Sequence, residues 1–444
     1  MPEKQTSHVR YLIVLMLFVA STFSYGDRVV LSISALEVTR TLHLDPLQIG
    51  YLLSAFSWAY VCGQLPAGGL LDRYGSKRIY GTSIVCWSVC ALLAGLCGYL
   101  PVALAFFALF AARFISGLAQ SPVFPGNGRI VAAWFPTSER GRASAIFNSS
   151  QYFSLVLFAP IMGWVVHRSG WRACFWLEGI AGLGLAIIWY KTVYSVKTHP
   201  RISSAEVQYI EAGGGLASLD AATRPAGTTL TWRAIRVLLS NRMLLGIFLG
   251  QYCITTLTWF FLTWFPIYLG QARHISIVKV GLLAALPALC GFAGGILGGV
   301  ISDLLLRRGH SLTFARKLPI VLGMLMAMTM IGCNYVNTSF AVMLLMSIAF
   351  FGKGIGALGW TVISDTSPKN LIGVTGALFN LIGNLAGITT PIVIGLIVKH
   401  TGSFKWALIY VAAAALVAIV AYLPIVGEIR RLDSANLFKG AVTE

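Results

Sequence analysis

The chain is organised around a short polar stretch that reads Gly68-Gly69-Leu70-Leu71-Asp72-Arg73-Tyr74-Gly75-Ser76-Lys77-Arg78. It separates two long apolar segments, and a looser copy follows in the second half of the chain: Gly298-Gly299, Asp303, Arg307-Arg308-Gly309 and Arg316-Lys317. Glycine lets two helices pack closely, and the aspartate can accept hydrogen bonds from a helix N-terminus or pair with an arginine. A motif repeated at the same place in both halves indicates an internal duplication.

Twelve apolar stretches surround the two motifs, six on either side of a polar, basic segment at residues 191–242. A membrane helix needs about 20 mostly apolar residues and must satisfy its backbone polar groups internally. We therefore predict an all-α membrane protein with two pseudo-symmetric six-helix halves, 1–190 and 243–444, joined by a cytoplasmic linker at 191–242 that is partly helical from Ser203 to Ala212. The predicted spans are roughly 11–35, 47–68, 79–98, 101–120, 145–168, 171–190, 243–267, 279–303, 317–335, 340–364, 371–397 and 404–426.

The formal net charge of +18 is explained by membrane topology rather than by nucleic-acid binding. Hydrophobic residues make up 57% of the 444 residues and charged residues only 11%, whereas a soluble domain carries about 25% charged residues. Most of the 33 Lys and Arg residues fall in the two termini and in the even-to-odd loops. This asymmetry follows the positive-inside rule and predicts that both termini are cytoplasmic.

Nothing in the sequence predicts a metal site, a cofactor or an enzyme. The eight cysteines lie in or beside apolar spans, with no CxxC pair and no histidine at metal-ligand spacing. Residues 354–359 match the dinucleotide pattern GxGxxG, but that pattern binds phosphate only at a strand-to-helix turn. Inside an apolar span we expect packing glycines instead. The sequence contains no GxxxxGK[ST] element, so nothing in it indicates transport driven by ATP.

Five ionisable residues lie well inside the predicted spans, away from their ends: Asp27, Arg28, Arg113, Glu178 and Lys353. A charge in the bilayer is costly, so such residues are read as functional by default. The alternative for each is a structural ion pair between helices. That alternative is weaker for Asp27 and Arg28, because adjacent charges in one span are costly unless both face a wet cavity.

Polar side chains at helical spacing extend this set. Pairs spaced for one helix face are Arg113 with Gln120, Lys353 with Trp360, and Asn380 with Asn384, and other spans contribute Tyr60, Gln151 and Gln251. Arginine can hold a carboxylate in bidentate fashion, and amides can bond hydroxyl groups. The combined lining suits a hydroxylated anion, although any single amide could equally join two helices.

The chain resembles the anion–cation symporters of the major facilitator superfamily nearly from end to end. The pattern GxxxD(R/K)xGx(K/R)(K/R) at residues 68–78 resembles the superfamily signature. The likeness is also carried by residues 25–28 (YGDR), 54–60 (SAFSWAY), 124–129 (FPGNGR), 134–136 (WFP), 260–266 (FFLTWFP) and 311–317 (SLTFARK). Residues 351–360 (FGKGIGALGW) and 387–391 (GITTP) look most like bacterial glucarate/galactarate permeases, with galactonate and hexuronate permeases close behind.

The resemblance implies proton-driven uptake of a sugar acid. Asp27 matches the proton-carrying carboxylate of the family's first helix, and Arg28 matches the arginine that holds the substrate carboxylate and couples it to the proton. While Asp27 is charged, we expect Arg28 to pair with it and to be less available to the substrate. Arg113 matches an arginine near a second proton site. Positions that contact substrate in the family are matched by Tyr60, Gln151, Gln251, Trp360 and Asn380, and those of the gating latch by Asp72 and Arg73.

Two residues extend or depart from this pattern. Lys353 offers a second cation, which a diacid needs for its second carboxylate; its alternative role is to neutralise Glu178 or a helix end. Gln120 stands where the family usually has a second proton-carrying glutamate. An amide cannot titrate, so a coupling scheme with two carboxylates is in doubt unless Glu178 substitutes.

We therefore expect a proton-coupled symporter for a sugar-acid anion of the glucarate type. It is expected to act as a monomer in the bacterial inner membrane by rocker-switch alternating access. The alternatives are a galactonate or hexuronate symporter, a receptor that binds sugar acids without moving them, and a multidrug exporter. A receptor would carry a large added cytoplasmic domain, whereas this chain has only the linker at 191–242. Exporters of cationic drugs favour acidic cavities, whereas this chain places Arg28 and Lys353 inside its spans.

Overall fold

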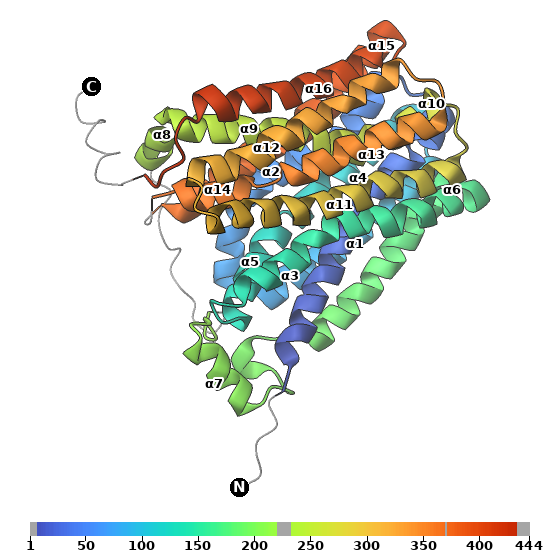
Figure 1. Ribbon diagram of the computed structural model, residues 1–444. Helices are drawn as coiled ribbons and strands as arrows, with labels where there is room; N and C mark the ends of the chain where they lie inside the picture. Colours follow the sequence, from blue (N-terminus) through green and yellow to red (C-terminus); the bar gives the residue numbers. More distant parts are fainter. Residues whose placement is uncertain (1–6, 220–231, 369–370, 433–444) are drawn as a thin grey trace. The chain divides into compact units, whose positions relative to one another are not determined.

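The computed structural model describes residues 7–219, 232–368 and 371–432, and within these ranges the regular structure is entirely helical. In the first part of the chain the helices are α1 (Val9–Thr41), α2 (Pro46–Tyr74), α3 (Ser76–Leu96), α4 (Val102–Gln120), α5 (Val123–Trp134), α6 (Arg140–Thr192) and α7 (Ser204–Ala212) (Figure 1). The second part contains α8 (Trp232–Ser240), α9 (Arg242–Trp259), α10 (Phe265–Gln271), α11 (Ile277–Arg307), α12 (Leu312–Ala327), α13 (Ser339–Ile355), α14 (Gly359–Thr366), α15 (Ile372–Thr401) and α16 (Lys405–Val420).

The twelve predicted spans are all found among these helices. Ten helical stretches in the described ranges are long and apolar enough to cross a membrane. One of them, α6, is interrupted at Gly170, whose φ of 80° and ψ of 171° are not helical, so it supplies both predicted spans 145–168 and 171–190. The 29-residue α2 supplies the remaining one. The predicted all-α architecture with twelve transmembrane helices is confirmed.

Backbone contacts divide the chain into two compact units. Of the described residues, unit 1 comprises 7–43 and 55–219, and unit 2 comprises 44–54, 232–368 and 371–432. Residues 44–54 belong with unit 2 because Lys399 Nζ donates to Asp45 Oδ2 at 2.9 Å and the carbonyl of Pro391 lies against Gly50. The predicted domain boundaries at 190/191 and 242/243 stay a prediction.

The duplication is visible in how helices pair inside each unit. In unit 1, α1 packs along α6, and α3 packs along both α4 and α6. In unit 2, α9 packs along α15, and α12 packs along both α13 and α16. Counted as spans, these are the same pairings displaced by six helices, as expected from two copies of one six-helix plan.

The linker helix α7 is anchored to the start of α1. Ser203 caps α7 by accepting a hydrogen bond from the Glu206 N–H at 3.2 Å, which confirms the predicted helix at 203–212. The buried Glu206 carboxylate accepts the backbone N–H of Val9 at 3.0 Å and of Arg10 at 3.2 Å. An acidic group at a helix N-terminus satisfies donors that the helix itself leaves free. Figure 1 shows α7 beside this end of α1.

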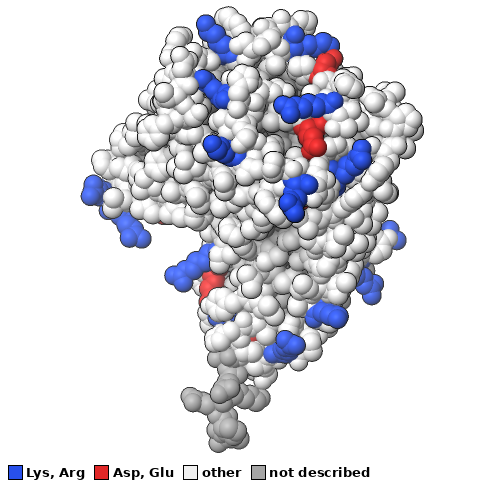
Figure 2. All heavy atoms as spheres, turned by 90° about the vertical axis from the view of Figure 1, so that its right-hand side faces the viewer, with Lys and Arg blue, Asp and Glu red and all other residues white. Residues whose placement is uncertain are grey.

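The described surface has the composition expected for a bilayer protein. On the face shown in Figure 2 most atoms belong to uncharged residues, and basic side chains outnumber acidic ones. Large hydrophobic side chains such as Phe107, Trp164, Ile180 and Phe340 are more than half exposed. Such exposure suits lipid better than water.

Candidate functional site

Unit 1 buries a charged cluster around Asp27 of α1. The Asp27 side chain is fully buried, and Arg113 Nη1 on α4 donates to its Oδ1 at 2.6 Å. Its second oxygen accepts hydrogen bonds from Ser116 Oγ at 3.1 Å and from Gln120 Nε2 at 2.8 Å. Three donors on one helix face therefore converge on a single carboxylate.

The sequence explains why these groups meet. Arg113, Ser116 and Gln120 are spaced by three and four residues on the continuous helix α4, so they share one face, as predicted for Arg113 and Gln120. On α1, Gly26 allows α6 to approach closely, because an added Cβ would lie 2.7 Å from the Phe158 ring. A larger residue at position 26 would push the two helices apart.

The ion-pair partner of Asp27 differs from the one we predicted. We expected Arg28 to pair with Asp27, but the ion pair in the structure joins Asp27 to Arg113. Adjacent residues on a helix do not face the same way. The Arg28 guanidinium instead lies over aromatic rings, 4.4 Å from the ring centre of Phe56 and 4.7 Å from that of Tyr25.

Gln120 is fully engaged by its neighbours. Its Oε1 accepts a hydrogen bond from Ser24 Oγ at 2.7 Å, and its Nε2 also donates to Ser116 Oγ at 3.1 Å. The amide therefore places a donor against Asp27, as a protonated glutamate at this position would. The departure from the family pattern keeps the hydrogen bond and removes the titratable proton.

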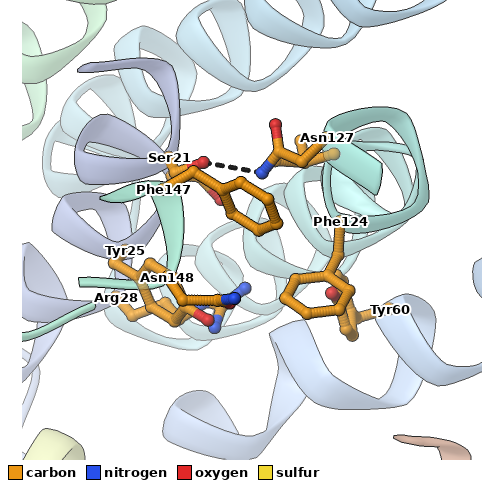
Figure 3. A pocket seen from close by; sticks show the side chains of 10 residues that line it. Ser21, Tyr25, Arg28, Tyr60, Phe124, Asn127, Phe147 and Asn148 are labelled. Carbon is orange, nitrogen blue, oxygen red and sulfur yellow. Dashed lines mark hydrogen bonds between the residues drawn. The ribbon is translucent and has the colours of Figure 1, made fainter. Parts of the chain in front are cut away.

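Arg28 and Tyr60 line a pocket inside unit 1 (Figure 3). The other lining residues are Ser21, Ser24, Tyr25, Val123, Phe124, Asn127, Phe147 and Asn148. In Figure 3 Arg28, Tyr25 and Asn148 lie together, across from Phe124 and Tyr60. The pocket combines a cation, amides, hydroxyls and aromatic rings, which is the chemistry needed to hold a polar anion.

Sequence reasoning missed two amides of this pocket. Asn127 Nδ2 donates to Ser21 Oγ at 2.8 Å, and Tyr80 donates from its hydroxyl to Asn127 Oδ1 at 3.0 Å. Asn127 lies in the quoted stretch 124–129, so its place in a polar motif was the available signal. The second missed amide is Asn148. Gln151, which we did predict, lies one turn further along α6, and its Nε2 donates to the backbone carbonyl of Asn148 at 3.3 Å.

In unit 2 the helix that we expected over 340–364 is broken. It consists of α13, ending at Ile355, and α14, beginning at Gly359. Our inference that Lys353 and Trp360 share one face assumed a continuous helix and was wrong in that premise. Lys353 is buried, with its Nζ 5.3 Å from the Phe350 ring centre, whereas Trp360 is 46% exposed.

The glycines at residues 354–359 pack helices, as predicted. A Cβ added at Gly354 would collide with the Gly291 carbonyl oxygen of α11. A Cβ added at Gly352 would meet the Gly323 carbonyl of α12 in the same way. The stretch lies in a helix and its end, so it is no dinucleotide-binding turn.

Three predicted residues of unit 2 lie close to one another. Gln251 Nε2 on α9 donates to Thr255 Oγ1 at 3.2 Å, and its Oε1 lies against Gly359, next to Trp360. The Trp360 ring meets Phe379 edge-on at 5.0 Å, beside Asn380 on α15. Asn384 Nδ2 donates to Asn380 Oδ1 at 3.1 Å, so this pair shares a face as expected.

Each of the two signature loops forms ion pairs within its own unit. Asp72 pairs with Arg129 of α5, and Arg129 also donates to the Leu219 carbonyl at 3.1 Å. In the copy, Arg316 Nε donates to Asp365 Oδ2 at 2.8 Å, and its Nη1 lies 3.5 Å from Asp303 Oδ1. Asp72 thus meets an arginine, one of the two partners we expected.

Glycine and arginine complete the signature. Gly75 has φ of 79°, which only glycine adopts readily, and it turns the chain from α2 into α3. The Arg73 guanidinium lies 5.3 Å from the Tyr74 ring centre.

A second buried carboxylate lies beside the Asp27 cluster. Glu178 of α6 is 2% exposed, and the charges of Asp27 and Arg113 both act on it. Within the described residues no N–H or hydroxyl donor reaches either of its carboxylate oxygens, and its hydrogen-bond neighbour is the Asp27 carboxyl group. Among the residues that the structure describes, no group of His, Cys, Asp and Glu side chains is arranged to hold a metal ion.

Twelve apolar helices that bury charged and polar side chains within their spans define a polytopic membrane protein. The model of the Major Facilitator Superfamily matches residues 17–391. The chain belongs to this superfamily.

Relatives match the chain over nearly its whole length. The probable galactarate/D-glucarate transporter GudP of Bacillus subtilis (strain 168) is 56% identical over 97% of this chain and 95% of its own. The probable galactarate/D-glucarate transporter GarP of Escherichia coli (strain K12) is 51% identical over 97% and 98%. The D-galactonate transporter of Escherichia coli O6:H1 is 37% identical over 95% and 97%. The resemblance deduced from the motifs is confirmed.

Solved structures share the fold at low sequence identity. The crystal structure of a D-xylose-proton symporter superposes with a TM-score of 0.71 at 15% identity, covering 94% of this chain and 98% of that one. A bacterial homologue of the lysosomal transporter Spinster gives 0.70 at 16% identity, covering 99% and 98%.

Proposed function

We propose that the protein is a proton-coupled symporter that imports a sugar-acid anion of the glucarate or galactarate type. The proposal places it in the bacterial inner membrane, with both termini cytoplasmic, acting as a monomer by alternating access of its two six-helix halves. Relatives named as galactarate/D-glucarate transporters, at 51–56% identity over almost the entire chain, support the substrate class.

The observation that carries the proposal is the buried cluster around Asp27. The next residue in the chain, Arg28, lines the pocket of unit 1. In the proposed cycle Asp27 takes up the coupling proton and Arg28 holds a carboxylate of the substrate. Protonation of Asp27 removes a negative charge next to Arg28 in the chain, so the positive charge of Arg28 attracts the anion more strongly. Proton and anion then favour each other's binding, and this coupling is reciprocal.

The other residues that the sequence predicted are proposed to bind the substrate or to latch the transporter. Tyr60 and Gln151 in unit 1, and Gln251, Trp360 and Asn380 in unit 2, are proposed to contact the substrate's hydroxyl groups and C–H faces. Lys353 is proposed to neutralise the second carboxylate, because a buried carboxylate without a partner is costly. Asp72 and Arg73 are proposed to latch one conformation.

A galactonate or hexuronate symporter is the closest alternative. The 37% identity to a D-galactonate transporter supports the galactonate alternative. A receptor without transport and a multidrug exporter are less well supported. The cationic residues Arg28 and Lys353 favour an anionic cargo over a cationic drug.

Counterflow in proteoliposomes tests the proposal. Vesicles containing the purified protein and loaded with unlabelled D-glucarate are expected to take up external labelled D-glucarate transiently above equilibrium, while protein-free vesicles do not. External galactarate should compete, with galactonate and glucuronate as weaker competitors. Counterflow that appears only with galactonate or with a hexuronate would replace the substrate assignment, and its absence with all sugar acids would contradict the function.

A further inference from the structure

The Asp27 cluster contains two acids and one arginine. Asp27 on α1, Glu178 on α6 and Arg113 on α4 are each at least 97% buried. If both carboxyl groups were ionised, the cluster would carry an uncompensated negative charge away from water, which is strongly unfavourable. With one proton on the pair, the cluster is neutral.

The hydrogen bonds show which acid holds that proton. Asp27 accepts three donors, from Arg113, Ser116 and Gln120, and is thereby stabilised as a carboxylate. No N–H or hydroxyl donor in the described residues reaches Glu178, and its hydrogen-bond neighbour is the Asp27 carboxyl group itself. Two carboxyl groups placed together cannot both ionise, and the one without donors keeps the proton.

No other titratable group in the described surroundings supplies a counter-charge. On α6 itself Cys174, one turn before Glu178, is a buried thiol. On α3, the helix that packs against Gly179 through Leu92 and Ser88, the titratable neighbour of the cluster is Cys90. Arg113 is therefore the cation that both acids share.

We propose that Asp27 and Glu178 share one proton, and that Arg113 pairs with whichever of the two is ionised. This deepens the proposed function and rests on it. When a proton from the medium binds Asp27, the Asp27–Arg113 ion pair is lost, and the arginine charge turns to Glu178. The O–H bond of Glu178 then breaks, its proton passes to water, and the cluster stays neutral. Arg113 Nε, which has no hydrogen-bond partner in the described residues, offers a donor for this second pairing.

The proposal also explains how the protein can work with Gln120. The family glutamate that the resemblance leads one to expect on α4 is replaced by an amide, and the second carboxyl group is supplied from α6 by Glu178. The amide preserves the donor to Asp27. The second carboxyl group thus lies on α6 instead of α4, and in both positions it is next to Asp27.

Transport by Glu178→Gln in proteoliposomes is the first test. In this variant a protonated Asp27 leaves Arg113 without a counter-charge, so Asp27 binds its proton more weakly. We expect glucarate uptake to need a pH lower by about one unit or more and uphill accumulation to be lost, with counterflow retained. The double variant Glu178→Gln/Gln120→Glu returns the acid to α4 and should recover the wild-type pH profile. An unchanged pH profile and accumulation in Glu178→Gln would overturn the proposal.

Infrared spectroscopy of the purified protein supplies a test that does not depend on transport. At neutral pH the wild type is expected to show the carbonyl band of a buried protonated carboxyl group, and Glu178→Gln is expected to lack it. Asp27→Asn should lack it too, because Arg113 then ionises Glu178. Glu37→Gln, a control on the same helix as Asp27, should retain it. A band that survives in Asp27→Asn would show an independent structural proton and overturn the sharing. Wild-type protein without counterflow would instead contradict the proposed function itself.

Discussion

Arg113 Nη1 lies 2.6 Å from Asp27 Oδ1, and both side chains are buried inside unit 1. This pair joins the first helix to the fourth at the position where the resemblance places the coupling proton. Protonation of Asp27 would break it, because a neutral carboxyl group no longer attracts the arginine charge. The mechanism that we propose depends on this relationship.

Replacing Asp27 by Asn should therefore separate binding from coupling. The amide keeps the shape of the side chain and cannot carry a proton. We expect Asp27→Asn to lose accumulation of glucarate against its gradient, while counterflow remains measurable in the same vesicles. Accumulation by the variant would remove Asp27 from the coupling role.

Gln120→Glu should act in the opposite direction to Glu178→Gln. Gln120 Nε2 is 2.8 Å from Asp27 Oδ2, so a carboxyl group there could not ionise alongside Asp27. The pair would bind its proton more tightly, and proton-dependent uptake should persist to a pH higher by about one unit or more. The pH profile of uptake measures this, and an unchanged profile at equal protein content would contradict it.

Lys353→Asn tests which acids are carried. A diacid needs two cationic partners, whereas galactonate or gluconate needs one. We expect the variant to bind glucarate and galactarate at least about tenfold more weakly, with smaller losses for the two monoacids. Competition uptake or calorimetry would show this difference, and equal losses for both classes would return Lys353 to a structural role.

His199 gives the linker region a pH-dependent stability. Burial lowers the pKa of His199, and the nearby Arg201 lowers it further, against the opposing bond to Thr192. Because the Arg201 N–H donates to Nδ1 at 3.1 Å, that nitrogen must stay unprotonated in the fold. The unfolded chain binds the extra proton more readily, so stability is complete above the ordinary histidine pKa of about 6.5 and falls as pH drops below it.

This dependence can be read from thermal unfolding followed by tryptophan fluorescence. The wild type should lose a few degrees of melting temperature on acidification, and His199→Gln should lose less. His310→Gln, which changes an exposed histidine, should behave as the wild type does. An identical pH dependence in His199→Gln and the wild type would contradict the assignment.

The sequence was sufficient to predict the helices and, of the residues that line the pocket of unit 1, Arg28 and Tyr60. Hydropathy located all twelve spans, because a membrane helix is defined by its own composition rather than by distant contacts. Spacing placed Arg113 with Gln120, and Asn380 with Asn384, because these residues lie on unbroken helices.

The failures have physical causes. The break between α13 and α14 lies in an apolar, glycine-rich stretch whose hydropathy resembles that of a continuous span. The pairing of Asp27 depends on which helix packs against which face of α1, and adjacency to Arg28 in the sequence carries no such information. The closeness of Glu178 to Asp27 likewise depends on α1 and α6 packing together.

The most direct test of proton-coupled sugar-acid uptake is the external pH of lightly buffered proteoliposomes when D-glucarate is added. We predict that wild-type vesicles alkalinise the medium as substrate and protons enter together, that Asp27→Asn vesicles do not, and that D-glucose produces no change in either. Glucarate counterflow by the wild type without any change in external pH would contradict proton coupling.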